Sequence, residues 1–180
     1  MSGFRSDEIR SDARFLEELA REEFSIDIVS GDRPLKQLDD LFNRLLRREK
    51  DPGVFAYLAH AFAASFGERA VNEIGGRWGA TMDDGLQIEY IGNRRSIKMT
   101  RLCAARMLAQ GAPLPVDPET GAALRFLADA SGDEARSFET LYDNLKRESD
   151  SGGWRLTDAG WTINNQQGDE NGRIKADSFI

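Results

Sequence analysis

The sequence predicts a single α+β domain that is mainly helical and carries one small antiparallel sheet. Three observations lead to this fold class: long segments with apolar residues three and four apart, one short segment of alternating polarity, and a length of 180 residues of which 40% are hydrophobic. A chain of this length buries roughly 70% of the surface that its unfolded form exposes. We therefore expect a helical α+β core over 1–148, with 149–180 adding a C-terminal hairpin and a mobile tail to the same domain.

Two helices are expected before residue 50. Ser6 suits the N-cap of the first helix, and Asp32 that of the second, in which Pro34 occupies the first turn. Residues 25–34 between them indicate an extended connector or a short edge strand. The residues expected on the buried faces are Ile9, Ala13, Leu16 and Ala20 in the first helix and Leu38, Leu41, Phe42 and Leu45 in the second.

The strongest helical pattern runs from Val54 to Ile74. Large apolar residues, Phe62 among them, recur there at spacings of three or four. Gly75 and Gly76 follow and supply the positive φ that commonly ends a helix. We expect this helix at the centre of the core, packed on the sheet.

A hairpin is expected directly after the double glycine. The Asp84-Gly85 pair favours a tight turn, and Leu86, Ile88 and Tyr90 then alternate with more exposed positions. Trp78 lies across the turn, where we expect it to fill the gap between helix and sheet rather than to contact a ligand.

The rest of the chain continues the mixed pattern. Gly92-Asn93 marks a second turn, and a further helix ends at Gly111, although the pattern leaves open whether 97–101 is strand or helix. Two more helices are expected over 122–130 and 134–147. A second hairpin is indicated by 154–163, and the polar, glycine-rich stretch 164–173 is expected to be mobile.

Short glycine and tryptophan patterns carry a family resemblance. Phe66-Gly67-Glu68, Gly75-Gly76-x-Trp78 and Asp84-Gly85 resemble the core pattern of an uncharacterised bacterial domain family of unknown function, over about a third of the chain. The resemblance implies an α+β fold, and it assigns no reaction and no functional residue.

The residue inventory excludes most standard catalytic chemistry. The chain has one histidine, His60, and one cysteine, Cys103, and it lacks the glycine-rich phosphate loops GxxxxGK[ST] and GxGxxG. We expect His60 to be hydrogen-bonded or partly exposed, and Cys103 to be a small buried hydrophobe. No metal site and no cofactor are expected.

One enzymatic alternative depends on carboxylates alone. A metal-assisted hydrolase or nuclease would draw on Glu68, Glu73, Asp83, Asp84 and Glu89. A restriction-type nuclease, however, needs a lysine two residues after an acid on the second strand, and the first lysine after Glu89 is Lys98. Turn and surface roles are the simpler explanation for these acids.

The segment 94–106 is the basic part of an otherwise acidic chain. Lys98, Arg101 and Arg106 would share part of a solvent face if the segment were helical. It is the candidate contact for an anionic partner, and a nucleic-acid-binding regulator that uses 94–106 is a second alternative. The candidate binding residues are Arg94, Arg95, Lys98, Arg101, Trp78 and Tyr90.

Charge and hydropathy suggest the working function. The formal net charge is −7, and the last third, 117–180, carries −6 of it. No apolar run reaches the length of a membrane span, so we expect a cytoplasmic protein without membrane contact. We predict a bacterial protein-binding or regulatory domain, immunity- or antitoxin-type, with another protein, a basic one, as its partner. The partner's identity and the oligomeric state are left open.

Overall fold

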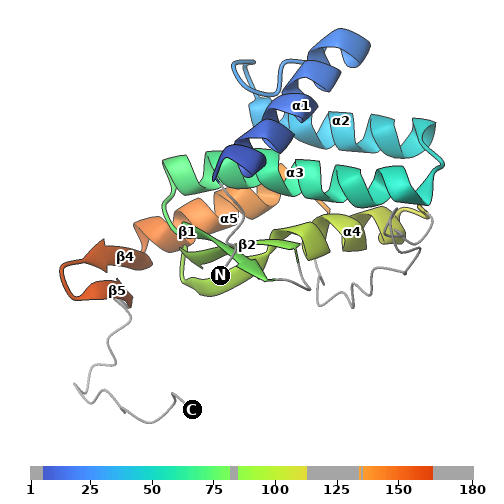
Figure 1. The fold of residues 1–180 in the computed structure, drawn as a ribbon. Helices are drawn as coiled ribbons and strands as arrows, with labels where there is room; N and C mark the ends of the chain where they lie inside the picture. The colour runs from blue at the N-terminus through green and yellow to red at the C-terminus, as the bar shows by residue number, and fades with distance from the viewer. Residues whose placement is uncertain (1–5, 82–84, 113–133, 135, 164–180) are drawn as a thin grey trace.

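The computed structural model has the predicted mainly helical α+β architecture (Figure 1). It describes residues 6–81, 85–112, 134 and 136–163; the expected helix over 122–130, the acids Asp83 and Asp84 and the tail from 164 lie outside these residues. None of the described helices is long and apolar enough to cross a membrane. In chain order the elements are α1 (Ser6–Phe24), α2 (Pro34–Arg48), α3 (Pro52–Glu73), β1 (Arg77–Thr81), β2 (Gly85–Ile91), β3 (Arg94–Lys98), α4 (Met99–Ala109), α5 (Phe138–Asp150), β4 (Trp154–Thr157) and β5 (Gly160–Ile163).

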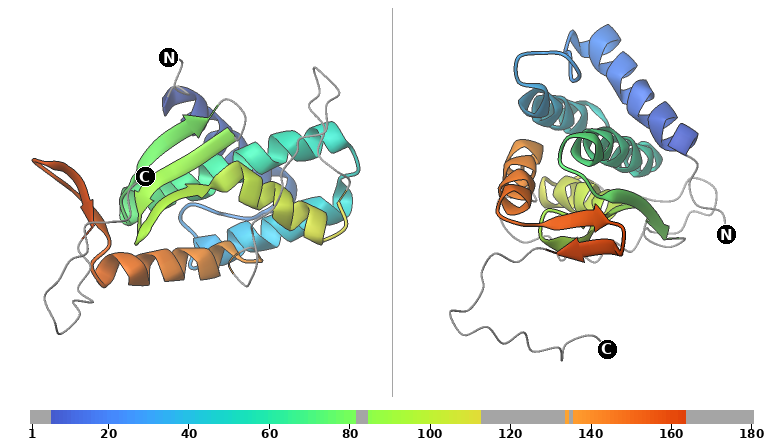
Figure 2. Two further views of the ribbon diagram at one scale, coloured as in Figure 1. Left: turned by 90° about the horizontal axis from the view of Figure 1, so that it is seen from below. Right: turned by 90° about the vertical axis from the view of Figure 1, so that its left-hand side faces the viewer.

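Helix α3 is the centre of the molecule, as its apolar pattern predicts. Helices α1 and α2 lie on one side of it, and α4, α5 and the three-stranded sheet lie on the other (Figure 2). Phe62 is fully buried and its ring meets those of Phe42 on α2 and Phe138 on α5, at centroid distances of 4.8 and 5.9 Å. The aromatic core therefore joins α2 and α3, which are neighbours in sequence, to the distant helix α5.

The first two helices bury the faces that their sequences predict, since all eight expected residues have at most 7% of their surface exposed. The α2 N-cap is Arg33 rather than the predicted Asp32, because Pro34 takes the first helical position. The connector does not form an edge strand. Instead the Asp27 carboxylate accepts hydrogen bonds from the backbone N–H groups of Val29 and Ser30, which closes a turn.

The sheet has the order β1-β2-β3 with antiparallel pairing throughout. Trp78 pairs with Ile88, and Ile88 with Ile97, so these side chains share the face that packs on the helices. The sequence left open whether 97–101 is strand or helix, and the structure contains both: β3 ends at Lys98 and α4 begins at Met99. The Thr100 hydroxyl then accepts a buried hydrogen bond from the Leu86 N–H, which ties α4 to β2.

A buried ion pair joins α2, α4 and α5. Asp39 of α2 accepts a hydrogen bond from the Arg106 guanidinium at 2.6 Å, and it also accepts from the Ser137 hydroxyl and the Phe138 N–H at the start of α5. Arg106 is 3% exposed, with its guanidinium over the ring of Phe42. The prediction that Arg106 shares a solvent face with Lys98 and Arg101 is therefore wrong, because Arg106 is buried and its charge is paired with Asp39.

Trp78 fills the space between α3 and the sheet, as predicted. A Cβ atom at Gly67 in the middle of α3 would lie 2.0 Å from the Trp78 ring atom Cη2, so only glycine leaves room for the indole. The indole N–H donates to the Glu68 carboxylate at 2.9 Å. The tryptophan is thus packed against α3 on one side and held by a hydrogen bond at its polar edge.

We predict that Gly67→Ala destabilises the fold when residue 78 is tryptophan and stabilises it when residue 78 is leucine. In the natural chain the added methyl group collides with the indole and should lower the free energy of unfolding by about 1–3 kcal/mol. In a Trp78→Leu background the collision is absent, and alanine should stabilise the helix by up to about 1 kcal/mol relative to glycine. Urea unfolding of the four proteins measures both effects. Destabilisation of equal size in both backgrounds would contradict the packing described here.

Candidate functional site

The β4–β5 hairpin projects from the end of α5 at one extremity of the molecule (Figures 1 and 2). Its register pairs Trp154 with Ile163 and Leu156 with Trp161. Because paired residues in an antiparallel ribbon share a face, these four apolar side chains all lie on one side. Arg155 and Thr162 pair on the other side. The hairpin therefore has one apolar face and one polar face.

Tyr90 attaches the apolar face of the hairpin to the main sheet. Its ring stacks on Trp161 at a centroid distance of 5.2 Å and meets Trp154 edge-on at 5.0 Å. The Arg77 guanidinium also lies over the Tyr90 ring, 5.2 Å from its centroid. A two-stranded ribbon is marginal by itself, so these aromatic contacts supply much of its support.

The orientation of Tyr90 corrects the predicted strand pattern. Strict alternation would place Tyr90 on the core face with Leu86 and Ile88, but Tyr90 has a φ of 57° and Ile91 is the fully buried residue. A left-handed conformation at a bulky residue costs on the order of 1 kcal/mol and reverses the alternation after it. The burial of Ile91 and the stacking of Tyr90 on the hairpin offset this strain.

The base of the hairpin is held by a close backbone approach. The Trp154 N–H donates to the Gly92 carbonyl at 2.7 Å. A Cβ atom at Gly153 would lie 2.1 Å from that same carbonyl oxygen, so glycine is required there. The turn between β2 and β3 is held in turn by α5, because the Asn93 N–H donates to the Glu148 carboxylate. The hairpin is thus positioned by both the sheet and α5.

The outer part of the apolar face is open to solvent. Leu156 is 67% exposed and Ile163 is 37% exposed, and Leu156 is the most exposed large hydrophobic side chain among the described residues. Contiguous apolar surface that is rimmed by polar residues marks an interaction site more often than scattered apolar residues do. We therefore take the apolar face of the hairpin, defined as Trp154, Leu156, Trp161 and Ile163, as the candidate functional site.

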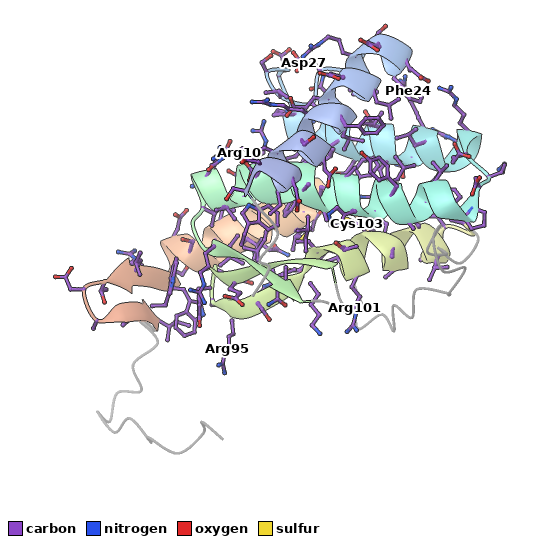
Figure 3. The ribbon with its side chains drawn as sticks, in the orientation of Figure 1. Arg10, Phe24, Asp27, Arg95, Arg101 and Cys103 are labelled. Atoms are coloured by element: carbon purple, nitrogen blue, oxygen red, sulfur yellow. The ribbon has the colours of Figure 1, made fainter. Side chains whose placement is uncertain are left out.

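The structure separates the two neighbouring arginines that the sequence predicts to be binding residues. Arg94 forms ion pairs with Glu134 at 2.5 Å and Glu148 at 2.7 Å, and these hydrogen bonds raise the pKa of its guanidinium. Its charge is matched inside the molecule, where it joins β3 to α5. Arg95 is exposed and points away from the body on the side of the sheet (Figure 3).

The other predicted binding residues are distributed over different environments. Arg101 points away from the body on the same side as Arg95 (Figure 3), but Arg101 and Lys98 are partly buried and each has an interaction of its own. Trp78 packs beneath Gly67, and Tyr90 supports the hairpin. Of the six candidates, Tyr90 therefore contacts the hairpin, and only Arg95 is exposed.

The three carboxylates of the enzymatic alternative that the structure describes each have a different partner. Glu68 binds the Trp78 indole, Glu73 accepts from the Tyr142 hydroxyl, and Glu89 pairs with Arg77 at 2.8 Å. Over residues 6–81, 85–112, 134 and 136–163, no group of three or more histidine, cysteine, aspartate or glutamate side chains is arranged to hold a metal ion.

A polar groove of about 350 Å³ lies between α1, α3 and the connector after α1. Its lining charges are largely paired with one another: Arg10 lies 3.9 Å from Glu68, and Arg69 lies 3.0 Å from Glu73 while also donating to the Val29 carbonyl. A ligand there would have to displace existing ion pairs, so the groove is a weaker candidate than the hairpin.

The two reactive side chains that the sequence singles out have the packed roles expected of them. Cys103 is fully buried in α4, and burial raises the pKa of its thiol to about 12, far from the value of a reactive thiolate. His60 is partly exposed and lies 3.3 Å from Asp12 of α1. Burial lowers the pKa of His60, so the imidazole is neutral at pH 7 and links α1 to α3.

Comparison with known proteins does not assign a family or a function to the chain. No known protein family, no curated protein and no solved structure matches the chain. The predicted resemblance to an uncharacterised bacterial family accordingly stays a prediction. The candidate site must therefore be judged by its own chemistry.

Sequence reasoning located the second hairpin but did not single it out as a site. The signal was present, because Trp154 and Leu156 alternate with polar residues on one strand, as Trp161 and Ile163 do on the next. The pattern alone does not reveal that the core leaves this face open. The placement of this face depends on its contacts with Tyr90, and no sequence pattern predicts the left-handed conformation of Tyr90.

We predict a pH dependence of stability that originates at His60. The pKa of His60 is lower in the folded chain, so the unfolded chain binds its proton first as the pH falls. The free energy of unfolding should therefore decrease as the pH is lowered through the ordinary histidine range near 6.5. Urea unfolding between about pH 7.5 and about pH 5.5 should show this slope, and His60→Gln should flatten it.

Asp12 provides the control for this prediction. Burial raises the pKa of Asp12, so its protonation stabilises the folded chain, and this occurs at lower pH. Asp12→Asn should therefore leave a decrease in stability across the histidine range. A slope that is unchanged in His60→Gln would show that another group is responsible.

Proposed function

We propose that the chain is a protein-binding domain and that the apolar face of the β4–β5 hairpin is its docking surface. The observation that carries the proposal is the exposure of Leu156 and Ile163 on a face that has no polar residue. Aromatic and aliphatic groups of this kind form the centres of protein interfaces, where their burial contributes roughly 25 cal/mol per Å². An immunity, antitoxin or other regulatory role in the cytoplasm is compatible with such a module and is part of the proposal.

The aromatic contacts favour a protein over a nucleic acid as the partner. Sequence-independent binding of single strands depends on aromatic rings with a free face on which bases stack. The Tyr90 ring is already contacted by Trp161, Trp154 and Arg77, and Trp78 is packed beneath Gly67. The most exposed side chains on the apolar face of the hairpin, Leu156 and Ile163, are instead aliphatic, and aliphatic groups are suited to contact with a protein.

Site-specific photocrosslinking tests this proposal. A benzophenone amino acid is placed at position 156 on the apolar face or at position 162 on the polar face of the same hairpin. Irradiation in the source cell should give a discrete protein adduct from position 156 and little from position 162. An excess of the unlabelled natural chain should suppress the adduct, because both compete for one surface.

The matched competitor is a Leu156→Asp chain. Since Leu156 is 67% exposed, this substitution should change the free energy of unfolding by less than about 0.5 kcal/mol. It should nevertheless fail to suppress the adduct, because a carboxylate on the exposed part of the apolar face opposes burial. Adducts of equal yield from positions 156 and 162, or equal competition by both chains, would contradict a docking role for this face.

A further inference from the structure

The free edges of the hairpin supply a second type of contact. In the described residues β4 and β5 pair only with each other as strands, so each has one edge without a strand partner. At the base, the Trp154 N–H is occupied by the Gly92 carbonyl. Unpaired N–H and C=O groups along an edge are a template for an added strand. The hairpin projects from the end of α5 (Figure 2).

A strand added at this edge would continue the two faces of the hairpin. Its alternate side chains would extend the apolar face, beside Leu156 or Ile163, and the intervening ones would extend the polar face, beside Arg155 or Thr162. The two faces therefore specify an extended segment in which apolar and polar residues alternate.

The exposed basic residues on β3 and β4 indicate which polar residues the bound segment would carry. Arg155 on β4 and Arg95 on β3 are exposed, and neither has a carboxylate partner among the residues that the structure describes. By contrast, Arg77 is paired with Glu89, and Arg94 with two glutamates. On the hairpin itself the one acidic residue is Asp158 in the turn. The unmatched charge available to a ligand on β3 and β4 is therefore positive.

We propose that the edge of the β4–β5 hairpin binds an extended segment of a partner protein in which apolar and acidic residues alternate. This inference rests on the proposed function and gives the partner's chemistry. The partner is thus acidic at its contact, in contrast to the basic partner that the overall charge of −7 suggests. Backbone hydrogen bonds to the edge supply affinity, and the carboxylates beside Arg155 and Arg95 supply selectivity.

A second copy of the chain is a poorer occupant of the same edge. Antiparallel pairing of β4 with the β4 of another copy would place two Arg155 side chains near each other, and like charges across a strand pair are destabilising. The strands are also only four residues long. A stable dimer usually buries about 1,600 Å² in total, which two short hairpin edges do not provide.

Peptide selection tests the inference without a known partner. A displayed library of random ten-residue peptides is selected on the full chain and depleted on its Leu156→Asp variant. We expect the recovered peptides to alternate apolar residues with aspartate or glutamate. Affinity for the best synthetic peptide should decrease with salt, as expected for charge-assisted contacts.

Charge reversal is the decisive comparison. Arg95→Glu combined with Arg155→Glu should weaken binding of that peptide at least tenfold, and a lysine-substituted version of the peptide should then bind better than the acidic one. Arg44→Glu combined with Arg47→Glu is the matched control, because both arginines are exposed on α2 and the net charge changes equally. This control should alter affinity less than twofold.

Backbone methylation tests the edge itself. N-methylation of every second peptide residue should abolish binding in one frame and be tolerated in the other, because alternate N–H groups face the strand edge. Equal tolerance in both frames, or peptides indifferent to the charge reversal, would overturn the inference while leaving the Leu156-dependent docking surface in place. Three other results would also overturn it. The selection could recover no peptide that depends on Leu156, the chain could bind oligo-dT in a way that the charge reversal abolishes, or sedimentation could show self-association through the hairpin. The photocrosslinking result then decides separately whether the proposed function survives.

Discussion

The carboxylate of Asp39 is the interaction on which the arrangement of the C-terminal half depends. It lies on α2, neutralises the buried guanidinium of Arg106 on α4, and accepts hydrogen bonds at the N-terminus of α5 from the Phe138 and Glu139 N–H groups. A carboxylate at a helix N-terminus satisfies unpaired N–H groups and complements the helix dipole. Three helices from distant parts of the sequence are therefore oriented by one side chain.

The position of the hairpin follows from that of α5. Ser137 and Phe138, which Asp39 binds, begin the helix, and Glu148 near its end binds Arg94 and the turn after β2. The chain leaves α5 and enters β4 directly beside this turn. An error in the placement of α5 would consequently displace the base of the hairpin from Tyr90. The candidate docking surface lies at the periphery, but its position depends on the interactions of Asp39 and Glu148 with the two ends of α5.

Much of this fold is readable from local sequence, because local forces determine it. The apolar faces of α1, α2 and α3, the double-glycine exit and both hairpins follow from periodicity and turn chemistry, and the structure has them where predicted. The burial of Arg106 was not predictable, since an arginine on a helix is normally solvated and its partner is 67 residues away in sequence. The rotation of Tyr90 was missed for the same reason: its compensation comes from Trp161, a residue outside its own hairpin.

A double-mutant cycle on Asp39 and Arg106 tests the central claim most directly. Asp39→Ala leaves Arg106 as an uncompensated buried charge and should reduce the free energy of unfolding in urea by about 3–5 kcal/mol. Arg106→Met should cost much less, because methionine packs between Phe42 and Phe138 while Asp39 still caps α5. The double variant should be more stable than Asp39→Ala alone, since it removes the unpaired charge. Additive losses, with the double variant less stable than either single one, would contradict the account.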